Sequence, residues 1–180
     1  VDIQCLGTFP NSPEIALFPV RDTGGAVTAA VAAVPYLRGA DLPVPSPGET
    51  PADTARRMTD AVQGIMRSLE ETHSARYGDT VPLIYMAHMF VRGGQATEES
   101  ERPVQTVAGN MVSLPPDIFP ASAAYVALGH LHRAQKIAHP ANVPVHYSGS
   151  VIPMSFTEAG YRHRLLEVDI DDNRASPDRC

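Results

Sequence analysis

The sequence predicts an α/β domain in which helices pack against a sheet, and two observations support this fold class. Apolar segments with strand character alternate along the chain with one long amphipathic segment. Two of the apolar segments, residues 81–91 and 123–132, are nearly continuous, which is typical of strands covered on both faces. The chain has 180 residues, 43% of them hydrophobic, and is therefore long enough to bury a core.

The first two predicted strands lie near the N-terminus, at residues 14–20 and 26–37. Between them stands RDTGG (21–25), in which Asp22 and two glycines suit the backbone of a hairpin loop. We therefore expect these strands to pair antiparallel.

The clearest predicted helix follows a proline-rich connection at residues 42–51. Thr50 can cap it, Pro51 suits its first turn, and Asp53 completes a pattern similar to a capping box. Apolar residues then recur every three or four positions, as expected for a helix with one face on a core. They are Ala55, Met58, Val62, Ile65, Met66 and Leu69. The helix should end before Gly78.

The remaining elements alternate between buried strands and loops. After the strand at 81–91, the polar and glycine-containing segment 92–102 predicts a loop. The strand at 123–132 is followed by residues 135–140 and 143–149, which resemble a hairpin.

A last strand is expected at 162–170, before a polar and mobile tail. We therefore divide the chain into one domain, residues 1–170, and a tail, residues 171–180.

The charge balance limits how the chain could hold nucleic acid. Twenty acidic and 14 basic residues give a net charge of −6, and no basic patch is visible along the sequence. Action on a phosphate backbone would then require metal ions or a partner to supply positive charge. Cys5 and Cys180 form no disulfide framework, and the sequence has no signal peptide or membrane span, so we expect a cytoplasmic protein.

Three histidines follow the two apolar strands and are the candidate metal ligands. His88 stands near the end of the first strand, and His130 and His132 stand at the end of the second, after Gly129. In extended chain, residues i and i+2 point to the same side, so His130 and His132 can converge, while Gly129 lets the backbone turn. Ligands of open α/β sheets bind beyond the carboxyl ends of strands, and neutral imidazole is a common ligand of Zn²⁺, Mn²⁺ or Fe²⁺.

The other four histidines are expected to be structural or solvated. His73 stands at a helix end, where a cation complements the helix dipole. His139, His146 and His163 fall in the hairpin and the last strand.

Taken together, these segments resemble the SbcD family of nuclease subunits, within the calcineurin-like metallophosphoesterases. The resemblance follows the chain in order over nearly its whole length, at AAVPYLRGADL, AHMFVRGG, YVALGHLHRAQKI, VHYSGSVIPMSF and RHRLLEVDI. It implies a β-sandwich of two mixed sheets flanked by helices, of which this chain would form a part.

The resemblance also implies a chemistry and a set of partners. Members of the family cleave DNA with two Mn²⁺ ions and work with an SbcC-type ATPase subunit. Their late histidine motifs fall on His88, His130 and His132. By the resemblance, His88 and His130 bind one metal and His132 binds the other.

The chain departs from the family at the early motifs D-x-H, G-D and G-N-H-D. No Asp stands two residues before a His, Gly78-Asp79 reads as a helix cap, and Gly109-Asn110 is followed by Met111. The resemblance therefore places the catalytic His and the bridging Asp in a preceding segment, and no catalytic residue is assigned within this chain. We expect the chain alone to be inactive and to self-associate through exposed apolar surface.

The function expected is thus part of a metal-dependent DNA exonuclease and endonuclease of repair and recombination. Two alternatives stay open: a metallophosphoesterase acting on small phosphoesters, and a degenerate module that only binds a partner.

Overall fold

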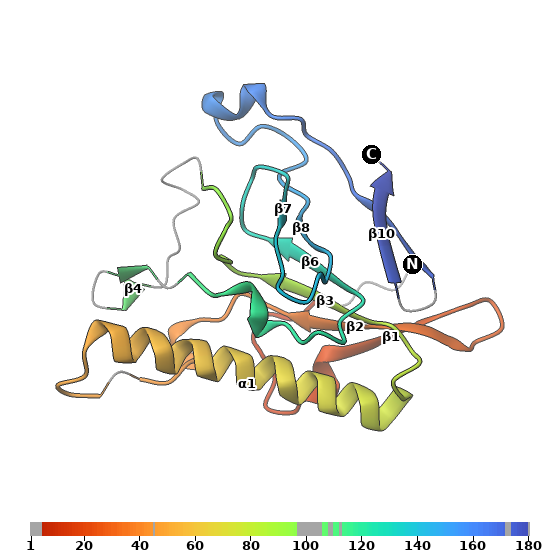
Figure 1. The fold of residues 1–180 in the computed structure, drawn as a ribbon, viewed down its shortest axis with the longest axis horizontal. Helices are drawn as coiled ribbons and strands as arrows, with labels where there is room; N and C mark the ends of the chain where they lie inside the picture. Colours follow the sequence, from red (N-terminus) through yellow and green to blue (C-terminus); the bar gives the residue numbers. More distant parts are fainter. Residues whose placement is uncertain are drawn as a thin grey trace.

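The computed structural model describes residues 5–44, 46–96, 106–107, 110–111, 113–171 and 174–179. The α/β class is confirmed, because a six-stranded sheet packs against a long helix, α1 (Figure 1). In spatial order the strands of this sheet are β1 (Leu17–Arg21), β2 (Val27–Val34), β3 (Leu83–His88), β6 (Tyr125–Gly129), β8 (Val145–Tyr147) and β7 (Gln135–Ile137). Two-stranded sheets are formed by β9 (Glu167–Asp171) with β10 (Arg174–Arg179) and by β4 (Thr106–Val107) with β5 (Asn110–Met111).

Helix α1 (Pro51–Tyr77) has the boundaries that its caps predict. The Thr50 hydroxyl accepts a hydrogen bond from the backbone N–H of Asp53 at 3.2 Å. At the other end Gly78 takes φ +77° and donates its N–H to the carbonyl of Ser74. The buried face matches the predicted stripe at Met58, Val62, Met66 and Leu69, while Ala55 and Ile65 are only half-buried and Thr54 is buried instead.

Short 3-10 helices connect the main elements. They are η1 (Pro13–Ala16), η2 (Gly39–Asp41), η4 (Pro116–Ile118) and η5 (Phe156–Gly160). In the described part of the chain, no helix combines the length and the apolar character that a membrane span requires.

The centre of the sheet is parallel and its edges are antiparallel. Strands β2, β3, β6 and β8 run in one direction, while β1 and β7 each pair antiparallel with a neighbour. Both predicted hairpins, β1–β2 and β7–β8, are therefore confirmed. The carboxyl ends of the four parallel strands lie at the same edge of the sheet.

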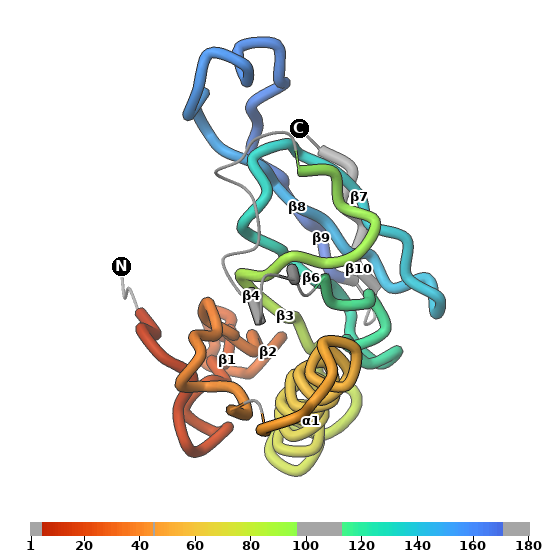
Figure 2. Tube along the Cα trace, turned by 90° about the vertical axis from the view of Figure 1, so that its left-hand side faces the viewer, coloured from red at the N-terminus to blue at the C-terminus, as the bar shows by residue number. Residues whose placement is uncertain are grey.

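The two faces of the sheet differ in burial. Alternate residues of β3, namely Leu83, Tyr85 and Ala87, are buried on the face toward α1. On the other face Ile84 is half-buried and Met86 is 56% exposed. Figures 1 and 2 show α1 on one side of the sheet and the segment around η5 projecting on the opposite side. The prediction that β3 is covered on both faces is wrong, because the described residues leave this second face open.

The ends of several elements also differ from the prediction. The two central strands are shorter than expected, and β9 begins at Glu167 rather than at residue 162. The segment expected to be a polar tail contains β10, which pairs antiparallel with β9. Of the predicted loop 92–102, residues 97–102 lie outside the described part, as does the Gly109 of Gly109-Asn110.

Candidate metal centre

His88 and His130 lie at the carboxyl edge of the sheet, on neighbouring parallel strands. His88 is the last residue of β3 and pairs in register with Gly129, the last residue of β6. His130 follows directly, so its ring lies beside that of His88. The ring centroids are 5.3 Å apart, and the planes meet at 79°.

Gly129 provides the space for this pair. A Cβ at position 129 would lie 3.1 Å from Nδ1 of His88, closer than side chains ordinarily pack. Gly129 was predicted to let the backbone turn, but the residue with the unusual backbone conformation is the next one, His130. His130 has φ +112°, a region that non-glycine residues rarely occupy. Such strain is characteristic of functional sites, where the surrounding structure holds it in place.

The described residues do not bring His132 together with the other two histidines as a group of three ligands. The prediction that His130 and His132 converge assumed extended chain, but β6 ends at Gly129 and the positive φ of His130 breaks the strand geometry. The ring of His132 instead meets Glu158 in η5, with Nδ1 2.7 Å from the carboxylate Oε1.

Glu158 is a residue of the candidate site that the sequence prediction missed. Its side chain is buried, and its second oxygen, Oε2, accepts the backbone N–H of Met154 at 2.8 Å. The hydrogen bond from His132 and then that from Met154 lower the pKa of Glu158, so the carboxylate is ionised and Nδ1–H of His132 donates to it. A lone acid in the segment VIPMSFTEAGY (151–161) was the only signal available in the sequence.

A glycine turn holds the segment after β8 against the His132 loop. Gly149 has φ +79°, and a Cβ there would lie 2.7 Å from both the carbonyl oxygen of His132 and the N of Ala134. The next residue, Ser150, donates its N–H to the carbonyl of His132 at 2.9 Å. His163 connects the same region, since its Nδ1 lies 2.9 Å from the carbonyl oxygen of Ser150 and its Nε2 lies 3.3 Å from that of Glu158.

Aromatic rings surround the His88–His130 pair. Tyr36, just beyond the end of β2, meets the edge of His88 with centroids 5.9 Å apart, and Phe90 meets His130 at 6.3 Å. Partial burial, followed by the charge that His130 can carry, lowers the pKa of His88. His88 is therefore neutral at pH 7, the form in which imidazole binds metals.

The described residues supply only some of the ligands that a metal site would need. No three His, Cys, Asp or Glu side chains in the described ranges come together as a group that could hold an ion. The adjacent rings of His88 and His130 have the chemistry of two ligands for one ion, and His132 with its buried carboxylate has the form of a supported ligand.

The remaining histidines are structural, which is one of the two alternatives predicted for them. His73 is buried on the core face of α1, and this burial lowers its pKa, so it is not a solvated cation at the helix end. His139 donates from Nε2 to the carbonyl of Phe119 and accepts the N–H of Ala141. His146 stacks on Tyr125 with centroids 5.7 Å apart.

Comparison with known proteins finds similar nuclease subunits, and no family model matches the chain. The chain is 36% identical over 173 residues to the SbcD subunit of the SbcCD nuclease of Rhodobacter capsulatus, covering 93% of this chain and 41% of that protein. It is 40% identical over 104 residues to the subunit of the same name in Bacillus subtilis, covering 58% of this chain and 26% of that protein.

The corresponding Escherichia coli K12 subunit is 30% identical over 151 residues, 83% of this chain and 35% of that protein. The chain therefore spans about two fifths or less of the length of these relatives. Along most of its own length, the chain is of the SbcD type and corresponds to a segment of such nuclease subunits.

Proposed function

We propose that the chain forms part of the nuclease domain of an SbcD-type subunit that hydrolyses DNA phosphodiesters with an SbcC-type ATPase partner in the cytoplasm. The observation that supports this best is the His88–His130 pair at the carboxyl edge of the sheet, with strained backbone at His130. The relatives named as SbcCD nuclease subunits support the same function.

The proposed metal is Mn²⁺, bound as two ions in the complete domain. Such a pair, when bound, polarises the phosphodiester and supplies a hydroxide nucleophile at neutral pH. His88 and His130 would hold one ion and His132 the other. Since the described residues bring no carboxylate to the His88–His130 pair, we expect the 180-residue chain alone to be inactive.

Glu158 has a positioning role in this proposal. Its carboxylate fixes the proton of His132 on Nδ1, so Nε2 is the nitrogen that can ligate a metal. A carboxylate in this position also orients the ring and raises the basicity of the ligating nitrogen.

The test compares DNA cleavage with cleavage of a small phosphoester by the complete gene product. We expect Mn²⁺-dependent nicking of plasmid DNA and little hydrolysis of p-nitrophenyl phosphate. His88→Gln and His130→Gln should each lower nicking by on the order of 100-fold, because each removes a metal ligand. His146→Gln, which changes another histidine of the same sheet, is the matched control and should nick normally.

The same assay separates the two alternatives. Preferential hydrolysis of p-nitrophenyl phosphate would assign a general metallophosphoesterase. The absence of a complete ligand group in the described residues favours a second alternative, a non-catalytic module. Failure to hydrolyse either substrate would support it, as would codons upstream of Val1 that lack D-x-H and G-N-H-D.

We further propose that the isolated chain self-associates through its uncovered apolar surface. On the open face of the sheet Met86 is 56% exposed, and several apolar residues of the segment after β8 are exposed as well. These are Val151, Ile152, Met154 and Phe156. Exposed apolar side chains of this kind favour association.

A further inference from the structure

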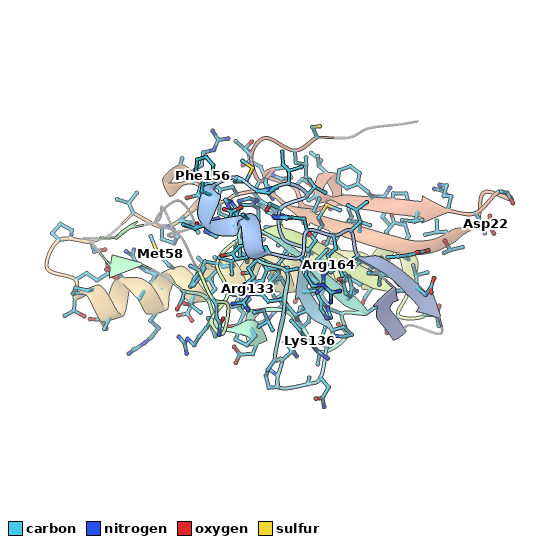
Figure 3. The ribbon with its side chains drawn as sticks, turned by 90° about the horizontal axis from the view of Figure 1, so that it is seen from above. Asp22, Met58, Arg133, Lys136, Phe156 and Arg164 are labelled. Carbon is cyan, nitrogen blue, oxygen red and sulfur yellow. The ribbon has the colours of Figure 1, made fainter. Side chains whose placement is uncertain are left out.

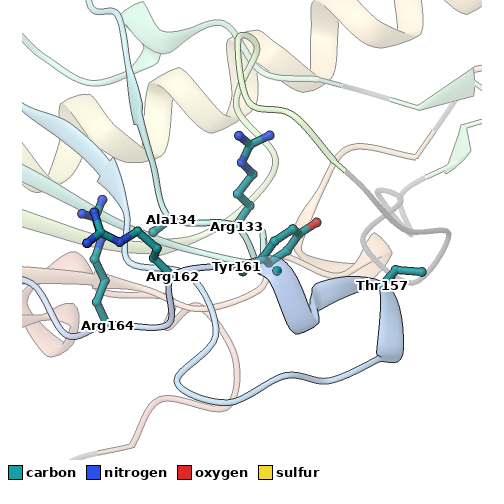
Figure 4. A pocket seen from close by; sticks show the side chains of 7 residues that line it. Arg133, Ala134, Thr157, Tyr161, Arg162 and Arg164 are labelled. Atoms are coloured by element: carbon teal, nitrogen blue, oxygen red, sulfur yellow. The ribbon is translucent and has the colours of Figure 1, made fainter.

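Three arginines from two separate segments of the chain line one pocket on the side of the sheet away from α1. Arg133 comes from the loop after β6, and Arg162 and Arg164 come from the segment that follows η5. The pocket has a volume of about 460 Å³, and Thr157 and Tyr161 also line it. In Figure 4, the ends of Arg162 and Arg164 lie close together at the left of the view, while Arg133 and the ring of Tyr161 lie beside each other nearer the middle.

The described lining of this pocket is basic and contains no carboxylate. This concentration of positive charge stands in a chain whose net charge is −6. Arg162 and Arg164 are two residues apart in the sequence, and Arg133 joins them only because η5 folds back against the His132 loop. Figure 3, which views the molecule from the side away from α1, shows Arg133 and Arg164 on this side.

Arg133 is held in place by neutral side chains. Its Nη1 donates to Oε1 of Gln95 at 3.1 Å, and the amide of Gln135 donates to the carbonyl of Arg133 at the same distance. Guanidinium has five N–H donors, and the bond to Gln95 uses one of them. An arginine held by amides keeps its full positive charge for an anionic ligand.

The pocket is built from the same two segments that form the His132–Glu158 pair. Arg133 follows His132 directly, and Thr157 precedes Glu158. Between Arg162 and Arg164, His163 connects Ser150 to Glu158. The position of the arginines is therefore fixed relative to the candidate metal centre.

We propose that this arginine pocket binds backbone phosphates of nucleic acid that flank the phosphodiester at the metal centre. The proposal rests on the proposed function and adds the residues that position the substrate. Guanidinium groups match phosphate oxygens through paired hydrogen bonds, and phosphate contacts set the register of a protein on a duplex. An acidic peptide of a protein partner is less favoured, because the pocket adjoins the edge where phosphodiester chemistry is proposed.

The test measures binding of a fluorescein-labelled DNA duplex of about 25 base pairs to the 180-residue chain by fluorescence anisotropy, in EDTA and over a range of salt concentrations. Arg133→Ala, Arg162→Ala and Arg164→Ala should each weaken binding by on the order of tenfold at low salt. Each should also reduce the slope of log affinity against log salt by roughly 0.9, the value for one lost phosphate contact. Arg→Lys variants at these positions should retain most of the slope, since they keep the charge.

Arg56→Ala is the matched control, because Arg56 is also exposed and lines a pocket, but with Asp60 beside it. It should leave both affinity and slope unchanged. Far-UV circular dichroism and melting curves verify that each variant is folded. A labelled single strand of the same length shows whether the pocket favours duplex or single-stranded backbone, and either preference supports the proposal.

Three results would overturn the proposal: unchanged affinity and slope in folded arginine variants, an equal loss in Arg56→Ala, or competition by polyglutamate as strong as by unlabelled duplex. The last result would assign the pocket to an acidic protein partner. The binding assay contains no metal and requires no cleavage. The arginine proposal can therefore be refuted while the complete protein still nicks plasmid DNA, and it can be supported when the complete protein does not. The two proposals are thus tested independently.

Discussion

The two faces of β3 differ in what they contribute to the protein. The face toward α1 contains Leu83, Tyr85 and Ala87, all of them buried, and the Tyr85 hydroxyl donates to the carbonyl of Met66 in α1 at 2.8 Å. The opposite face contains Met86, which is exposed, and ends at His88. Within one strand, alternate residues therefore serve the core and the candidate metal centre.

The difference shows where stability and function are separated in this fold. Burial of apolar area by the α1 face stabilises the sheet. The strained backbone of His130, by contrast, lies at the carboxyl edge, where it contributes nothing favourable to folding. A buried tyrosine connects the two regions, since the hydroxyl of Tyr147 donates to the carbonyl of Met89 and accepts the N–H of Val91, each at 2.8 Å. The core thus fixes the chain directly after His88.

The largest expected effect comes from truncating the buried face. Leu83→Ala should lower the free energy of unfolding by about 2–5 kcal/mol, because it leaves a cavity beneath α1. Met86→Ala, three residues along the same strand, should change it by less than about 0.5 kcal/mol. Urea denaturation followed by circular dichroism measures both. Equal losses would mean that the open face is covered in solution.

The next effect concerns the tyrosine that connects the core to the site. Tyr147→Phe should destabilise by about 1–3 kcal/mol, because it leaves the buried N–H of Val91 without its partner. Tyr85→Phe is the matched control and should cost less, since the Met66 carbonyl that it releases lies in the middle of α1 and also accepts an intrahelical bond. Denaturant unfolding measures the loss of stability in each variant. A larger loss in Tyr85→Phe than in Tyr147→Phe would contradict this role of Tyr147.

A smaller effect should appear as a loss of stability in mild acid. Burial lowers the pKa of His73 despite the raising effects of the Val81 backbone, Asp79 and Glu70. Its folded pKa therefore lies below its unfolded value of about 6.5, so the unfolded state binds more protons and stability falls as pH drops below about 6.5. His88, whose pKa is also lowered, adds to the same trend. Melts between pH 8 and 5 should show this loss, and the loss should be smaller in His73→Gln.

A substitution on the open face of the sheet should have the smallest effect on stability, but it should change how strongly the chain self-associates. Met86→Ser should leave the free energy of unfolding nearly unchanged while lowering the fraction of associated chain. Analytical ultracentrifugation at micromolar concentrations measures the fraction. Val44→Ser, at a residue 78% exposed elsewhere, is the control. A wild-type chain that remains monomeric would refute the association proposal.

Local signals in the sequence were sufficient for the helix and the hairpins. Thr50 and Gly78 fix the ends of α1 through contacts a few residues apart, and the glycines of residues 21–25 permit the β1–β2 turn. The proximity of His88 and His130 was also predictable, because parallel strands end at one edge and both residues follow apolar runs.

Features that depend on distant contacts were not predictable. Glu158 lies 26 residues from His132, and the arginine pocket requires η5 to fold back over the loop after β6. The positive φ of His130 carries no composition signal, since the residue before it is the glycine. Finally, the apolar sequence of β3 indicates a strand that can be covered on both faces, while actual coverage depends on which other layers are present.

The most direct test of the central claim is a metal titration of the 180-residue chain by isothermal calorimetry, with Zn²⁺ and Mn²⁺ in separate experiments. We expect one Zn²⁺ per chain, with an affinity at least about tenfold weaker in His88→Gln and in His130→Gln and unchanged in His146→Gln. Two tightly bound Mn²⁺ per chain, or Zn²⁺ binding that survives loss of both His88 and His130, would contradict the claim that this edge of the sheet forms one part of a metal centre.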